Sequence, residues 1–136
     1  MIQVYSTGLA VNANDAFPFN NVSLDKGCAE VLAAPSTIQL NQRGVYLVEM
    51  DGFATGAAAG NNLIQLYVNG VAMPQAMSSF TTVSGDVSNY NFKSFVQVAN
   101  NNCNCNCLTS PTIIQIINGE QALTDAHINV VVTKIR

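Results

Sequence analysis

The sequence contains almost no helical periodicity. No stretch sustains apolar residues at positions i, i+3, i+4 and i+7, the pattern that predicts an amphipathic helix. Short runs rich in β-branched and aromatic residues recur instead, separated by Gly, Asn, Pro and Ser. These runs predict ten strands, near Ile2–Ala10, Phe17–Val22, Cys28–Leu32, Thr37–Leu40, Gly44–Ala54, Leu63–Val68, Met73–Phe80, Ser94–Val98, Thr112–Asn118 and Ala126–Lys134. About ten short strands in 136 residues predict a single all-β domain over residues 1–136, built as an antiparallel sandwich or barrel with negligible helix.

Two Asn-Gly pairs mark turns in this pattern. Asn69-Gly70 lies between the apolar runs LIQLYV and VAM and predicts a tight hairpin, because both residues tolerate the positive φ of a type I′ turn. Asn118-Gly119 follows TIIQII and predicts the start of a longer connection to the last strand. The longest stretches expected to be irregular are Thr55–Asn62 and Ala99–Pro111.

The composition favours an oligomer. Charged residues form only 10% of the chain, whereas an average soluble domain has roughly 25%, and a monomer usually keeps itself soluble with more charge. A mildly acidic monomer is the alternative. The net charge is −3 and the five basic residues are scattered, which argues against nucleic-acid binding. No apolar run reaches the ~20 residues of a membrane helix. The first residues show no signal-peptide pattern, so we expect synthesis in a cytoplasm.

Two predicted strands carry apolar side chains on both faces. In Thr112–Asn118, Ile113 and Ile117 oppose Ile114 and Ile116; in Gly44–Ala54, Val45 and Leu47 oppose Tyr46, Val48 and Met50. A two-layer sandwich buries only one face of each sheet, so a second cover is needed, and a partner subunit is the simplest one. A closed barrel with one face covered by loops is the alternative. We predict a homotrimer whose interface includes Tyr46, Val48, Ile113, Ile114, Ile116 and Ile117.

Several segments resemble the tumour-necrosis-factor (TNF) and complement-globular-head superfamily. IQLNQRGVYLVEMDG (Ile38–Gly52) is similar to that family's apolar strand, turn and Gly-x-Tyr, with Gly44 and Tyr46 in the matching positions. LIQLYVNGV and HINVVVTKI resemble its next hairpin and its last strand, and GLAVNANDAFPFNNV resembles the opening of its bacterial and bacteriophage branch. The family's Phe-rich ending is not matched, and its calcium-coordinating loops cannot be placed. The resemblance implies a jelly roll that assembles as a compact three-fold trimer.

Residues suited to catalysis are few. His127 is the only histidine, and Asp125 lies two residues before it, but no Gly-x-Ser-x-Gly supplies a nucleophile. Glu49 and Asp51 share one side of a strand; acid–base chemistry, calcium binding or a solvent-facing strand end each accounts for them. We therefore predict no catalytic residues and no cofactor, with a structural metal only as described next.

The segment NNNCNCNC holds Cys103, Cys105 and Cys107 at spacing i, i+2, i+4. In an extended segment all three sulfurs point to one side. A single chain offers only His127 and Cys28 as further zinc ligands, which makes a poor tetrahedral site. The three thiols are either free or, near a three-fold axis, form interchain disulfides or bind a soft metal such as zinc or iron, with disulfides favoured over metal.

Two functional classes remain. The first is a non-enzymatic virion surface protein of a bacteriophage: a capsid decoration or head-fibre trimer whose partners are capsid or other virion proteins, and a host surface glycan or protein if it mediates attachment. The second is the ligand-binding head of a secreted or spore-surface collagen-like bacterial protein. That head would normally follow a Gly-x-y stalk, which this sequence does not contain. We therefore expect the virion surface, or otherwise an extracellular location.

Overall fold

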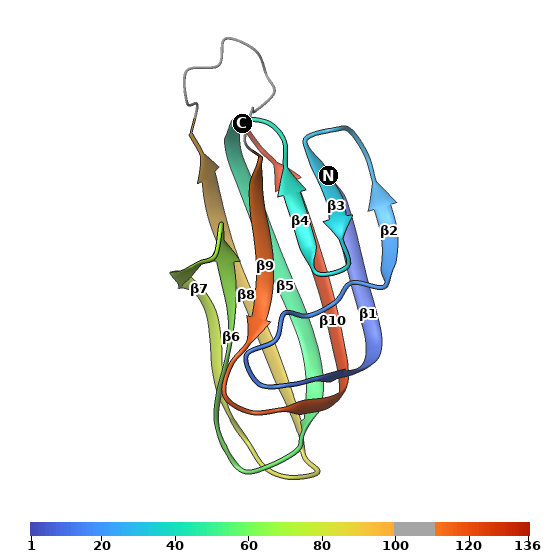
Figure 1. The fold of residues 1–136 in the computed structure, drawn as a ribbon, viewed down its shortest axis with the longest axis vertical. Helices are drawn as coiled ribbons and strands as arrows, with labels where there is room; N and C mark the ends of the chain where they lie inside the picture. The colour runs from blue at the N-terminus through green and yellow to red at the C-terminus, as the bar shows by residue number, and fades with distance from the viewer. Residues whose placement is uncertain (100–110) are drawn as a thin grey trace.

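The computed structural model describes residues 1–99 and 111–136, which form two five-stranded antiparallel sheets packed face to face (Figure 1). Sheet A has the strand order β2-β1-β10-β5-β8, and sheet B has the order β3-β4-β9-β6-β7. The described residues contain no helix. The predicted all-β jelly-roll sandwich is confirmed. The strands are β1 (Ile2–Val11), β2 (Asn21–Asp25), β3 (Glu30–Ala34), β4 (Thr37–Leu40), β5 (Gly44–Gly56), β6 (Gly60–Val68), β7 (Val71–Thr82), β8 (Val87–Val98), β9 (Thr112–Asn118) and β10 (Leu123–Lys134).

One strand prediction is wrong in most of its length. Residues 17–20 are not in a strand, because Pro18 has no N–H to give to a ladder. Phe17 and Phe19 are buried, and their backbone N–H groups donate to the carbonyls of Ile116 (2.8 Å) and Pro35 (2.6 Å), both on the sheet B side. The Ser6 hydroxyl, on sheet A, donates to the Pro18 carbonyl at 2.7 Å. This connection therefore fills the core and ties the two sheets together.

The strands on either side of the first expected irregular stretch, Thr55–Asn62, are longer than predicted. β5 continues to Gly56 and β6 begins at Gly60, so Thr55–Asn62 is mostly strand. The Asn69-Gly70 hairpin is confirmed: Val68 pairs with Val71, and φ is 50° at Asn69 and 80° at Gly70. Positive φ at both central residues is the geometry of a type I′ turn.

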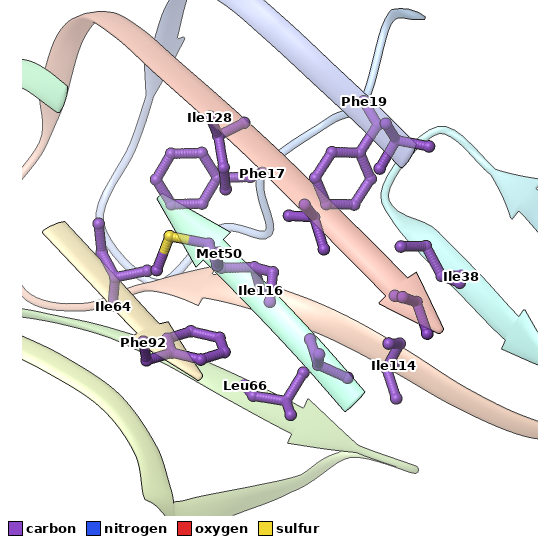
Figure 2. Packing of buried hydrophobic residues seen from close by; sticks show 14 of the residues in the cluster. Phe17, Phe19, Ile38, Met50, Ile64, Leu66, Phe92, Ile114, Ile116 and Ile128 are labelled. Atoms are coloured by element: carbon purple, nitrogen blue, oxygen red, sulfur yellow. The ribbon is translucent and has the colours of Figure 1, made fainter. Parts of the chain in front are cut away.

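The core consists of the inward-facing residues of both sheets. Ile114 and Ile116 of β9 point into it beside Leu66, Met50 and Phe92 (Figure 2). Tyr46 and Val48 of β5 are fully buried in the same cluster. Because side chains alternate along a strand, the residues between them face outward on each sheet.

Candidate oligomer interface

An exposed apolar patch lies on the outer face of sheet A. Leu47 of β5 pairs directly with Phe95 of β8, and the two side chains face away from the core together with Val45. Ile135 follows β10, and its N–H donates to the Val45 carbonyl at 2.8 Å. Phe95 is 60% exposed and Ile135 is 51% exposed. We call Val45, Leu47, Phe95 and Ile135 the sheet A patch.

Three of the four residues of the sheet A patch line a hollow. The hollow has a volume of about 340 Å³ and is lined by Val45, Phe95, Ile135 and Arg136. Exposed apolar side chains scattered one by one are normal on any protein surface, but an apolar hollow is a shape that a neighbouring side chain can fill. The patch is thus suited to contact with another polypeptide.

A polar band borders the patch on the same face. Lys93 lies 3.5 Å from Glu49, both side chains being largely exposed. Asn129 donates to Asp51 at 3.2 Å and accepts from Gln3 at 2.9 Å. Exposed ion pairs of this kind contribute about 0–1 kcal/mol. Glu49 and Asp51 thus engage side chains of neighbouring strands, and the described residues contain no group of three or more His, Cys, Asp or Glu that could hold a metal ion.

His127 lies further along this face and is packed against an aromatic ring. It pairs across the strands with Phe53, and the two rings stack with centroids 4.8 Å apart and an interplanar angle of 11°. Asp125 is exposed and has φ of 46°, at an irregularity of β10. The imidazole therefore belongs to the outer surface of the sheet, as the packing partner of Phe53.

The predicted interface residues fall into two groups. Tyr46, Val48, Ile114 and Ile116 are buried inside the single chain, so their side chains do not reach its surface (Figure 2 shows Ile114 and Ile116). Ile113 is 36% exposed and lies with Ile117 on the outer face of sheet B, opposite Gln39 and Gln65 of the adjacent strands. Of the six, only Ile113 and Ile117 can contact a neighbouring subunit through their side chains. The alternation of β5 exposes Val45 and Leu47 instead.

Burial also changes the acidity of the tyrosine on β5. The Tyr46 hydroxyl donates to the Gln42 carbonyl at 2.7 Å. Burial raises the pKa of Tyr46 to about 12, and the negative charge of Glu30 acts in the same direction. Tyr46 is thus a structural phenol that anchors the start of β5.

Cys103, Cys105 and Cys107 lie outside the described residues. Cys28 is exposed in the connection between β2 and β3, where the Gln42 side chain approaches its sulfur at 3.5 Å. Within the described part of the chain, no helix is long and apolar enough to cross a membrane.

The fold brings together basic residues that are far apart in the sequence. Arg43, Lys134 and Arg136 line a second hollow of about 420 Å³ with Gln97 and Ala99, next to the sheet A patch. Three of the five basic residues therefore gather at one end of the sandwich. A positive rim beside an apolar hollow favours partners that bring carboxylates to it.

Three solved structures share this architecture over almost their full length. The globular domain of zebrafish complement 1qA protein superposes with a TM-score of 0.73 at 9% identity, covering 99% of this chain and 96% of that one. The PRD1 vertex protein P5 gives 0.62 at 16% identity, with 99% and 96% covered. Murine APRIL gives 0.61 at 10% identity, with 98% of each chain covered.

The fold is the TNF- and C1q-like jelly roll. No protein-family model matches the sequence, and no curated protein matches it. At these sequence identities the structural similarity establishes only the fold of the chain. One fold hosts many functions, so the function depends on the surfaces of this protein.

Proposed function

We propose that the chain is a homotrimer held together through the sheet A patch. The observation that carries this proposal is the apolar hollow on the outer face of sheet A, with Phe95 and Ile135 more than half exposed at its edge. Stable interfaces between identical subunits are more apolar than the remaining surface. In a cyclic trimer each subunit contributes two different surfaces, so a hollow on one subunit receives a projecting group from the next. The resemblance to the TNF and complement-head family supports the three-fold state.

We further propose that this trimer is a non-enzymatic surface protein of a bacteriophage virion, in a capsid decoration or head-fibre role. The similarity of its fold to the PRD1 vertex protein P5 supports this role. The low charge, 10% of residues, and the segment GLAVNANDAFPFNNV support it as well. A trimer matches three-fold positions on a capsid or fibre by symmetry. Its partners would then be capsid or other virion proteins.

Binding assays with the purified protein test the virion role. The protein is incubated with undecorated capsids and, separately, with host cells, and the bound fraction is measured after sedimentation. Saturable binding to capsids supports decoration, and binding to cells supports attachment to the host surface. Binding to neither contradicts both forms of the proposal.

The alternative is the ligand-binding head of a secreted or spore-surface collagen-like protein. The similarity to the zebrafish complement 1qA globular domain, with a TM-score of 0.73, favours it. The position of the coding sequence separates the two. Capsid, portal or tail genes beside it support a virion protein, and a Gly-x-y repeat joined to it supports a stalked head.

A further inference from the structure

A groove lies on the outer face of sheet B, away from the sheet A patch. It has a volume of about 480 Å³, within the size range of small-molecule sites. Its apolar surface comes from Leu63 and Tyr67 of β6 and from Met77 of β7. Ser79 pairs with Leu63 across these two strands. Asn14, Gly119 and Glu120, from two connections, line its other side.

Gly119 allows the β9–β10 connection to lie directly against β6. A Cβ at this position would lie 2.7 Å from the Leu63 carbonyl oxygen and 3.1 Å from Oδ1 of Asn62, distances that no other residue would tolerate without movement. The Asn14 N–H donates to the Gly119 carbonyl at 2.8 Å, which brings the β1–β2 connection to the same place. Three chain segments thus meet at the groove in fixed positions.

Buried amides beneath the groove hold these segments. The Asn62 side-chain amide donates to Oδ1 of Asn118 at 2.9 Å, and the Asn118 amide donates to the Gln121 carbonyl at 2.8 Å. The Gln121 N–H donates to Oδ1 of Asn62 at 3.2 Å. Asn62 and Asn118 are both buried, so this network is shielded from water. The groove is therefore preformed by the fold.

The rim of the groove carries polar side chains that the fold leaves available. Asn14, Asn61, Ser79 and Glu120 are exposed and line it. Among the described residues, the one hydrogen bond that these side chains make is a long contact of 3.5 Å from the Thr81 hydroxyl to Oδ1 of Asn61. Glu120 is the only charged residue on the lining, and none of the five basic residues contributes to it. The groove thus combines an apolar floor, an aromatic ring, amides, a hydroxyl and one carboxylate.

We propose that this groove binds a neutral saccharide. A sugar ring has one face of C–H groups, which can pack on Tyr67, Leu63 and Met77, and an edge of hydroxyls, each of which donates and accepts hydrogen bonds. Asparagine amides offer both donors and acceptors, and the Glu120 carboxylate accepts from two hydroxyls. An anionic ligand would meet Glu120 without a compensating cation. All lining residues belong to one chain, so this inference does not rest on the trimer or on the virion role.

Binding is measured by following the backbone amide resonances of the assembled protein during titration with saccharides. The probes are glucose, galactose, mannose, N-acetylglucosamine and lactose. We expect at least one of them to shift amides of Asn61–Tyr67, Met77–Ser79 and Gly119–Glu120 in a saturable manner. Saturation by none of the five, or shifts confined to other regions, overturns the proposal.

Variants separate binding in the groove from a change in folding. Tyr67→Ala and Glu120→Gln should each weaken binding by about tenfold or more, which corresponds to about 1.4 kcal/mol, whereas Tyr67→Phe keeps the aromatic face and should bind nearly as the parent does. Asp86→Asn is the matched control, an exposed carboxylate outside the groove, and should leave affinity unchanged. Unchanged affinity in Glu120→Gln, with melting temperatures equal to the parent, contradicts the proposal.

Charged probes test the ligand class. If an oligolysine peptide saturates the shifts of the same amides at a lower concentration than any saccharide, the groove is a site for basic peptides. The saccharide assignment then fails. Stronger binding of sialyllactose than of lactose likewise contradicts the predicted preference for neutral sugars, because sialic acid adds a negative charge next to Glu120. Preference for lactose over sialyllactose supports the assignment.

Discussion

Glu30 is a buried carboxylate that connects the two sheets. It lies on β3 of sheet B, is only 2% exposed, and accepts a hydrogen bond of 2.7 Å from the backbone N–H of Lys134 on β10 of sheet A. Its other carboxylate oxygen lies 2.9 Å from the amino group of Met1. A buried acceptor of this kind is costly to remove because its donors lose their partner.

We expect Glu30→Ala to lower the free energy of unfolding by about 1–3 kcal/mol, the usual cost of leaving a buried hydrogen-bonding group unsatisfied. Glu30→Gln keeps an oxygen that can accept a hydrogen bond from the Lys134 N–H, so its unfolding free energy should fall less than that of Glu30→Ala. Glu49→Ala is the control, since the exposed pair with Lys93 contributes about 0–1 kcal/mol. Urea unfolding of the three variants measures the differences, and equal losses for Glu30→Ala and Glu49→Ala would contradict this role.

Two buried phenols should make the protein sensitive to alkali. Burial raises the pKa of Tyr46 to about 12 and raises that of Tyr90 as well. In the unfolded chain a tyrosine ionises near its ordinary pKa of about 10. Because the folded state favours the neutral phenol, the stability from these groups is complete below about pH 10 and is lost as the pH rises through the folded-state pKa.

Tyr46→Phe should therefore reduce the loss of unfolding free energy between about pH 10 and pH 12, because the variant has no phenol to ionise at this position. Stability is measured by urea unfolding at each pH, and phenol ionisation by ultraviolet absorbance. If the unfolding free energy of the variant fell as steeply with pH as that of the parent, Tyr46 would not contribute to the sensitivity to alkali.

The Asn118 side chain holds the β9–β10 connection in place. The side chain is fully buried, donates to the carbonyls of Gln121 (2.8 Å) and Asn12 (3.2 Å), and accepts from Asn62. It joins the end of β1, the β6 strand and the connection just before β10 at one point. These hydrogen bonds explain why the β9–β10 connection, which has no regular secondary structure, has a fixed position at the end of the sandwich.

Asn118→Ala should destabilise the protein by about 2–4 kcal/mol, because it leaves several buried groups without partners at once. Asn61→Ala, one residue from Asn62 but exposed, should change stability by less than about 0.5 kcal/mol. The two variants are compared by urea unfolding. If Asn118→Ala lowered the unfolding free energy no more than Asn61→Ala does, the hydrogen-bond network would not stabilise the fold as proposed.

Element types follow closely from the sequence, whereas the direction of some side chains does not. Short runs rich in β-branched and apolar residues predict β4 and β9 with their correct ends, and Asn69-Gly70 predicts the correct hairpin. In β5 and β9, however, both faces are apolar, so the period of two does not say which face is inward. Tyr46 and Ile114 point into the core, because packing against the opposite sheet decides which face is inward.

The groove could not be predicted from the sequence for a different reason. Its lining comes from two neighbouring strands and from two connections that are more than 100 residues apart, at Asn14 and Gly119–Glu120. Asn118-Gly119 signals a turn in the sequence, but its close approach to β6 depends on the tertiary fold. The sheet A patch likewise needs the pairing of β5 with β8 before Leu47 and Phe95 become neighbours.

The predicted role of Cys103, Cys105 and Cys107 concerns the assembled protein. If Cys103, Cys105 and Cys107 join subunits, non-reducing gel electrophoresis should show dimer and trimer bands that a reductant removes, or elemental analysis should find zinc or iron. Replacing all three by serine should then lower the melting temperature of the assembly while the far-ultraviolet circular dichroism stays that of a β protein. Monomer bands, no bound metal and an unchanged melting temperature would contradict this role.

We propose separate roles for the two faces of the sandwich. In the proposed trimer, the hollow of the sheet A patch contacts another subunit, while the sheet B groove remains exposed to solvent. Phe95→Asp places a charge in the apolar hollow, and burying an unpaired charge is costly. Ile113→Asp makes the same change on the outer face of sheet B and is the matched control.

The most direct test is the mass of the protein in solution, measured by sedimentation equilibrium at micromolar concentration. The parent and Ile113→Asp should have three times the chain mass of 14.4 kDa, and Phe95→Asp should have the mass of a single chain with an unchanged β-type circular dichroism spectrum. A parent protein of 14.4 kDa would contradict the homotrimer. A trimer that survives Phe95→Asp but dissociates in Ile113→Asp would contradict its placement on sheet A.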